Sequence, residues 1–161
     1  MDHKKKIFKP AYLVVLLLTM ISYQIICERS IYPNVPFRMK IQDSILSNVM
    51  DPPYQYRIME PVLGYSMQRV LSRFAHNPLK LHTFSYQIIM FFCLLGIYSQ
   101  FYSFLKKFFS DQACVTGLLF LAVVIPLGIS SFWQDGDYYT LFFYLVGLNL
   151  IFSNKDITCL L

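Results

Sequence analysis

Four blocks of apolar residues alternate with polar segments along the chain. The blocks cover residues 11–27, 83–105, 113–129 and 138–152. A helix needs about 20 mainly apolar residues to cross the hydrocarbon core of a bilayer, and each block reaches or approaches that length. The runs are too long and unbroken for the strands of a membrane barrel. The pattern therefore predicts an all-α, polytopic membrane protein with four transmembrane helices in a single membrane domain.

The first block follows four lysines, Lys4, Lys5, Lys6 and Lys9. A basic start before an apolar run is also typical of a cleaved signal peptide, which stays open as an alternative. The run is about 17 residues long, which exceeds the usual core of a signal peptide. It ends in residues 23–29 without the small residues of a cleavage site. We interpret it as an uncleaved helix whose N-terminus lies in the cytoplasm.

The polar segment 28–82 separates the first two blocks and lies on the outer side in this topology. We expect a short helix over residues 39–49 and an amphipathic helix over residues 62–74. A central arginine such as Arg69 opposes insertion by about 2.5–3.5 kcal/mol, so the second helix is expected on the membrane surface or packed on the protein. Its apolar residues recur at spacings of three and four: Leu63, Met67, Val70, Leu71 and Phe74.

Composition and charge agree with a membrane protein. Hydrophobic residues make up 56% of the chain and charged residues 14%, against about 45–50% and about 25% in soluble domains. Lys106, Lys107 and Lys155 join the N-terminal lysines on the predicted cytoplasmic side, as the positive-inside rule requires. The outer segment contains seven Lys or Arg residues, but the rule weakens as a loop approaches about 60 residues. The sequence has no basic helix or stripe, which argues against a nucleic-acid partner.

Candidate chemistry gathers on the outer side. Asp43 and Asp51 are the candidate catalytic carboxylates of the first outer segment, and Asp135 and Asp137 form a second acidic loop. Carboxylates at a membrane surface can act as a general base or hold a divalent cation that neutralises a phosphate. The alternative is that these residues are ordinary solvated loop charges, with Asp135-Gly136-Asp137 forming a turn.

Arg57 lies in a stretch that is bracketed by prolines at positions 52, 53 and 61. Its guanidinium can hold a phosphate bidentately, and Tyr56 stands beside it as a second candidate for phosphate binding. In the alternative, Arg57 pairs with Glu60 or Asp51, and Tyr56 is an interfacial anchor. We expect His82, which borders the second apolar block, to be a surface residue.

Residues 54–61, Tyr-Gln-Tyr-Arg-Ile-Met-Glu-Pro, resemble the Tyr-Arg-x-Leu-x-Pro signature of bacterial multi-pass membrane proteins related to the C-type glycosyltransferases. The resemblance extends to the loop of Asp135 and Asp137 and to residues 140–152. It implies an inner-membrane enzyme with a catalytic acid in its first outer loop, a polyprenyl-phosphate sugar as donor and a divalent cation as cofactor. Such enzymes have eight or more spans, so the resemblance implies that this chain is an N-terminal portion.

Two other function classes are compatible with the sequence. The first is non-enzymatic: a small inner-membrane subunit or scaffold that binds a membrane-protein partner through residues 28–82. A transporter is the less favoured reading, because ion-coupled transport usually requires ionisable residues inside the membrane and none of the four apolar blocks contains a charge at its centre.

Overall fold

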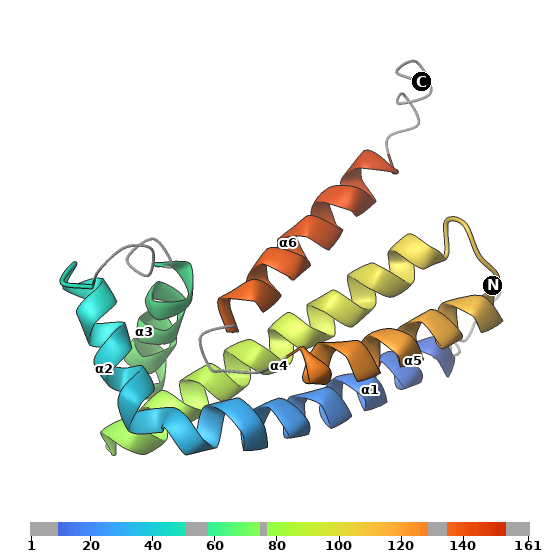
Figure 1. Ribbon diagram of the computed structural model, residues 1–161. Coiled ribbons are helices and arrows are strands. Elements are labelled where there is room, and N and C mark those ends of the chain that lie inside the picture. The colour runs from blue at the N-terminus through green and yellow to red at the C-terminus, as the bar shows by residue number, and fades with distance from the viewer. Residues whose placement is uncertain (1–9, 51–57, 75–76, 129–134, 154–161) are drawn as a thin grey trace, which may run out of the picture.

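The computed structural model describes residues 10–50, 58–74, 77–128 and 135–153. Within these ranges the regular structure is helical throughout and no strand occurs, which confirms the predicted all-α class (Figure 1). A π-helical turn and a 3-10 turn, η1 (Cys27–Ile31) and η2 (Tyr32–Asn34), connect the first two α-helices. The α-helices are α1 (Pro10–Ile26), α2 (Val35–Leu46), α3 (Met59–Leu71), α4 (Pro78–Leu105), α5 (Asp111–Leu127) and α6 (Asp135–Ile151).

Two helical stretches are long and apolar enough to cross a bilayer. They are Ala11–Leu46, which begins within α1 and continues to the end of α2, and Pro78–Leu105, which is α4. The helices α5 and α6 contain 17 residues each, which corresponds to about 26 Å at 1.5 Å per residue. The predicted spans at residues 11–27 and 83–105 therefore correspond to helices with the length and composition that crossing requires.

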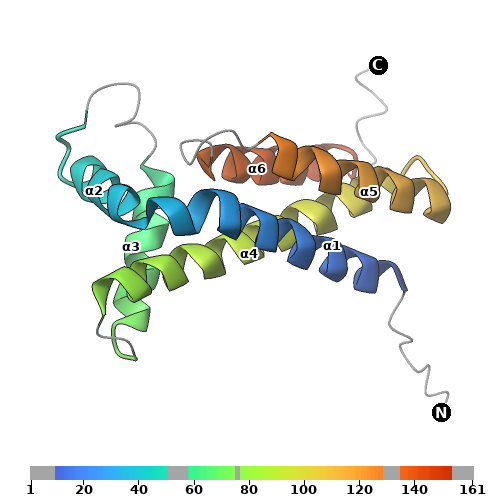
Figure 2. The same cartoon turned by 60° about the horizontal axis from the view of Figure 1, so that its bottom comes forward.

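The central helix is α4, which contacts α1, α5 and α6 along the bundle and α2 and α3 near its start. Figures 1 and 2 show that α4 and α6 run in one direction, and that α1 and α5 run in the other. The last turns of α1 and α5 and the first turns of α4 and α6 therefore point toward α2 and α3. We call this the α2/α3 end of the bundle.

The first part of the segment 28–82 is more helical than predicted, because helical turns continue from α1 through α2 as far as Leu46, and the helix expected at residues 39–49 overlaps α2. Pro33 and Pro36 occupy the first turns of η2 and α2, where the missing N–H of proline breaks no helical hydrogen bond. The backbone N–H of Tyr32 reaches back to the carbonyl of Cys27 and closes the π-helical turn. In Figure 1 the chain changes direction here, so that α2 leaves the line of α1.

The other helix boundaries differ from the predictions by at most five positions. The helix expected at residues 62–74 is α3, which begins at Met59 and includes Pro61 in its first turn. The helix α4 begins at Pro78 rather than at residue 83, because Asn77 caps it by accepting a hydrogen bond of 3.2 Å from the backbone N–H of Lys80. An asparagine followed by a proline is a strong start signal for a helix.

The turn between α4 and α5 is closed by a salt bridge at the opposite end of the bundle. Lys106 Nζ lies 2.8 Å from Asp111 Oδ1. The hydrogen bond to Asp111 and its negative charge raise the pKa of Lys106 above its ordinary value. A fixed turn of this kind sets α5 antiparallel to α4.

Apolar residues form most of the interior of the bundle, a few polar side chains lie among them, and apolar side chains also cover much of the outside. Ser22 of α1 is fully buried and shares a hydrogen bond of 2.6 Å with the hydroxyl of Tyr98 in α4. Asn149 of α6 donates to the carbonyl oxygen of Gln100 in α4 at 2.7 Å. By contrast, Phe120 of α5 is 70% exposed. Small and polar residues between helices, with apolar residues facing outward, are the packing that lipid surroundings favour.

Candidate functional site

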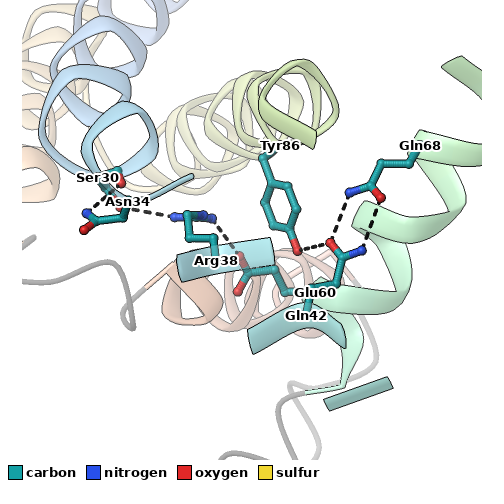
Figure 3. Close-up of polar contacts among 7 residues, drawn as sticks. All are labelled: Ser30, Asn34, Arg38, Gln42, Glu60, Gln68 and Tyr86. Carbon is teal, nitrogen blue, oxygen red and sulfur yellow. Dashed lines mark hydrogen bonds and ion pairs between the residues drawn. The ribbon is translucent and has the colours of Figure 1, made fainter. Parts of the chain in front are cut away.

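A buried group of polar side chains joins three helices at the α2/α3 end (Figure 3). We call it the Arg38 cluster. Its members are Ser30 of η1, Arg38 and Gln42 of α2, Glu60 and Gln68 of α3, and His82 and Tyr86 of α4. Because these residues come from segments that lie far apart in the sequence, the cluster fixes α2 and α3 against the start of α4.

The spacing of polar residues explains how the cluster forms. On η1 and α2, every fourth residue from Ser30 to Gln42 is polar, which places these residues on one face of the helical path. On α3, Glu60 and Gln68 are separated by two four-residue steps. His82 and Tyr86 are one such step apart on α4. The three polar faces meet, so this spacing is the signal that predicts the cluster, although it points to no particular chemistry.

Arg38 lies at the centre, with only 6% of its surface exposed. Its Nη2 donates to Glu60 Oε1 at 3.1 Å, and its Nη1 donates to Ser30 Oγ at 3.4 Å. The guanidinium carbon lies 4.8 Å from the ring centre of Tyr86, in a cation–π contact. A buried charge is stable only when it is paired and hydrogen-bonded in this way.

Gln42 connects the other members of the cluster. Its amide and that of Gln68 exchange two hydrogen bonds, of 3.2 Å and 3.1 Å. The hydroxyl of Tyr86 donates to Gln42 Oε1 at 3.0 Å. Both amides and the hydroxyl therefore have partners, and the network holds α2, α3 and α4 in one fixed arrangement.

The expectation that His82 is a surface residue is wrong. Its side chain is 3% exposed, and its ring stacks on that of Tyr86 with the centres 4.5 Å apart. In the described part of the chain neither ring nitrogen has a hydrogen-bond partner. The reason for its burial is that α4 starts one turn earlier than predicted, so that His82 lies inside the helix where α3 and α4 meet.

One residue of the Tyr54–Pro61 motif, Glu60, forms an ion pair with another helix in the structure. The sequence leaves Glu60 open as a partner of Arg57, and in the described residues Glu60 forms an ion pair with Arg38. The next-to-last residue of the motif is therefore fixed to α2. Arg57, together with Tyr56 and Asp51, lies outside the described residues.

The structure describes part of the predicted set of carboxylates. Asp43 lies near the end of α2 and Asp137 lies in the first turn of α6, and both side chains are exposed. Asp135 begins α6, and its side chain is outside the described residues. The α2/α3 end thus contains Asp43 and Asp137, and no described contact joins the two. Within the described ranges, no three His, Cys, Asp or Glu residues are placed to hold a metal ion.

An open groove of about 450 Å³ lies between α2 and α4 at the same end. Its walls are mainly apolar, with Val35 from α2 and Leu79 and Phe84 from α4. Lys80, Thr83 and Gln87 of α4 supply the polar groups of this site. In the described residues the ammonium of Lys80 makes no hydrogen bond or ion pair. Such a groove can take an apolar chain together with one anionic group.

The helix α3 packs on the rest of the protein through a face that the sequence did not indicate. Pro61 and Gly64 are its buried residues, and a Cβ atom added at Gly64 would lie 2.8 Å from the ring of Tyr86. The apolar residues at spacings of three and four point elsewhere: Val70 is exposed, and Phe74, just after the helix, is 82% exposed. The two placements expected for this helix, packed on the protein and on the membrane surface, are therefore compatible. One face packs on α4, and the exposed apolar face is free to contact a membrane.

No protein family matches the chain, and no characterised protein or solved structure shows significant similarity to it. The resemblance to multi-pass glycosyltransferases consequently stays a prediction from the residues of the motif.

Proposed function

We propose that this chain is a four-span membrane protein of the glycosyltransferase-like class, acting on a lipid-phosphate-linked sugar at the outer face of the membrane. The observation that carries the proposal is that one end of the bundle combines exposed carboxylates with a mainly apolar groove, whose lysine ammonium makes no hydrogen bond or ion pair within the described residues. Asp43 of α2 and Asp137 of α6 belong to this end, and Lys80 belongs to the groove.

The proposed topology places α1, α4, α5 and α6 across the membrane, with the N-terminus in the cytoplasm. The alternating directions of these helices support it (Figure 1). Their outward surfaces support it as well, since Phe120 of α5 and Phe143 and Leu150 of α6 are large apolar residues that are exposed in the chain by itself. In this topology the α2/α3 end lies at the outer face.

The proposed reaction transfers a sugar from a polyprenyl phosphate to an acceptor hydroxyl. Asp51 or Asp43 takes the proton of that hydroxyl as its oxygen bonds to the anomeric carbon of the sugar. The bond from that carbon to the phosphate oxygen breaks, and the lipid phosphate leaves with the electron pair. Arg57 and Lys80 stabilise its negative charge, and a divalent cation held by carboxylates would contribute in the same way.

The test is to replace Asp51, Arg57 and Asp137 with Ala, one at a time, in the full gene product and to measure cell-surface glycan. Loss of a general base is expected to lower transfer by about 100-fold or more. Asp111→Ala is the matched control, because Asp111 is a carboxylate at the opposite end, paired with Lys106. Unchanged glycan in all three variants, at normal protein levels, would contradict the enzymatic proposal.

A non-enzymatic subunit is the second candidate, and the exposed apolar face of α3 favours it. Leu63 and Val70 are exposed on this helix in the chain by itself. A subunit would tolerate the three substitutions above and would lose its partner when this face becomes polar. The test is to purify the double variant Leu63→Ser/Val70→Ser beside the parent chain and to measure how much partner protein is recovered with each. Loss of the partner from the variant favours the subunit over the enzyme.

A further inference from the structure

A second groove, of about 360 Å³, runs between α1 and α5. The wall from α1 contains Leu18, Ile21 and Ile25, which follow one another at spacings of three and four and so form one stripe along the helix. The wall from α5 contains Ala122 and Val123 among other apolar residues. The groove therefore extends along the bundle, in the direction in which lipid chains lie.

The stripe on α1 ends at Arg29, which is the charged residue of this groove. Arg29 belongs to the π-helical turn η1, four residues beyond Ile25. Its side chain is exposed, and in the described part of the chain it makes no hydrogen bond or ion pair. Single π-helical turns within helices are frequent at functional sites. At the α2/α3 end, this guanidinium is placed at the level of the lipid head groups.

We infer that the α1/α5 groove binds an anionic phospholipid of the surrounding bilayer, with one acyl chain along the groove and the phosphate on Arg29. Charge complementarity selects this occupant. The groove supplies apolar walls for a chain, and the guanidinium provides a planar set of donors that fits phosphate oxygens bidentately. A neutral lipid would leave the positive charge of Arg29 without compensation, and a peptide would leave its own backbone groups without partners among these apolar walls.

This site is separate from the groove between α2 and α4, with which it shares no lining residue. It depends on the membrane placement in the proposed function and not on sugar transfer. A lipid bound at this position fills the space between α1 and α5, two helices that run side by side in the same direction (Figures 1 and 2). The site therefore serves to hold these helices together in the bilayer.

The experiment is native mass spectrometry of the full chain from mixed micelles that contain phosphatidylglycerol or phosphatidylcholine. The parent chain is expected to retain phosphatidylglycerol preferentially. Arg29→Gln is expected to reduce that retention roughly fivefold, because one basic residue near a membrane surface contributes about a factor of five in lipid affinity. The control is Arg69→Gln, since Arg69 is exposed on α3 and lies outside the groove.

A second pair of variants tests the chain-binding walls. Ala122→Phe fills the groove and is expected to reduce retention of phosphatidylglycerol, whereas Ala113→Phe on the exposed side of α5 is not. Equal retention by Arg29→Gln and the parent chain would overturn the inference, as would equal retention of both phospholipids. Displacement of phosphatidylglycerol by a polyprenyl phosphate at equal concentration would also overturn it. These measurements need no sugar transfer, so they can fail while the proposed enzyme activity stands.

Discussion

Arg38 and Glu60 form a salt bridge between α2 and α3, with Nη2 and Oε1 separated by 3.1 Å and the side chains 5% and 19% exposed. The pair lies in a cluster with Ser30 and Tyr86, which also contact the guanidinium. Glu60 lies within the Tyr-Arg-x-Leu-x-Pro-like stretch, directly before Pro61, so the pair fixes the end of that stretch, which forms the first turn of α3. The helices α2 and α3 are thus held to each other by charge, and Arg38 also contacts α4 through the ring of Tyr86.

Replacement of Arg38 with Met is expected to destabilise the protein by about 3 kcal/mol, because it removes the guanidinium that pairs with the partly buried carboxylate of Glu60. The measurement is the free energy of unfolding in detergent, followed by the loss of helical circular dichroism. The double variant Arg38→Met/Glu60→Leu is expected to recover most of the loss, since apolar residues replace both charges.

Arg69→Met is the matched control for Arg38→Met, because Arg69 lies on α3 but is exposed. Substitution of an exposed arginine is expected to change stability by less than about 0.5 kcal/mol. Equal stability of the two single variants would show that the salt bridge does not hold α2 to α3.

Gly64 and Gly147 provide a comparison of crowding at two helical glycines. Gly64→Ala is expected to destabilise the protein by about 1–3 kcal/mol, because the new Cβ would lie 2.8 Å from the ring of Tyr86. Tyr86 has little freedom to move, as it also bonds to Gln42 and stacks on His82.

Gly147→Ala is expected to leave stability unchanged or slightly higher, since a Cβ there meets no atom within 4 Å and Ala favours the helix by roughly 0.5–1 kcal/mol over Gly. Thermal unfolding of both variants in the same detergent is the measurement. A higher midpoint for Gly64→Ala than for Gly147→Ala would contradict the close contact between α3 and α4.

The hydrogen bond between Ser22 and Tyr98 gives a third prediction. A double-mutant cycle with Ser22→Ala and Tyr98→Phe is expected to give a coupling of about 0.6 kcal/mol, the average for hydrogen bonds between membrane helices. The bond is 2.6 Å long and both residues are fully buried. Tyr144→Phe, at an exposed position of α6, is the control. A coupling of zero would mean that α1 and α4 are held together by other contacts.

The apolar pattern of the sequence predicted the all-helical class and the approximate positions of α1, α4, α5 and α6. It gave no helix for residues 28–38, which include Pro33 and Pro36 and are helical in the structure, whereas the helix expected at residues 39–49 overlaps α2. Proline is compatible with a first helical turn, and the change from π-helical to 3-10 to α-helical geometry gives each proline such a position. A pattern of apolar residues carries no information about that change.

The candidate site was predictable in part. The sequence indicated Asp43 and Asp137 as candidates because both lie in segments predicted on the same side of the membrane. In the structure both are on the surface at one end of the bundle. The Arg38 cluster was missed, because the side of α3 that packs on α4 is its small and polar side, with Gly64 and Gln68. Sequence reasoning for soluble proteins assigns the apolar side to the interior, and that rule does not hold where lipid can cover it.

The membrane orientation leads to the last prediction, which uses two Ser→Cys substitutions at exposed positions. Ser47 follows α2 and Ser110 precedes α5, so they lie at opposite ends of the bundle. With the N-terminus in the cytoplasm, Ser47→Cys is expected to react with a membrane-impermeant maleimide in intact cells, and Ser110→Cys only after permeabilisation. The parent chain with its four cysteines sets the background; Cys27, Cys93 and Cys114 are buried, and Cys159 lies outside the described residues. The reverse labelling would place the seven basic residues of segment 28–82 in the cytoplasm, as the positive-inside rule alone prefers. It would move the carboxylates and both grooves to that side, and with them the proposed sugar transfer.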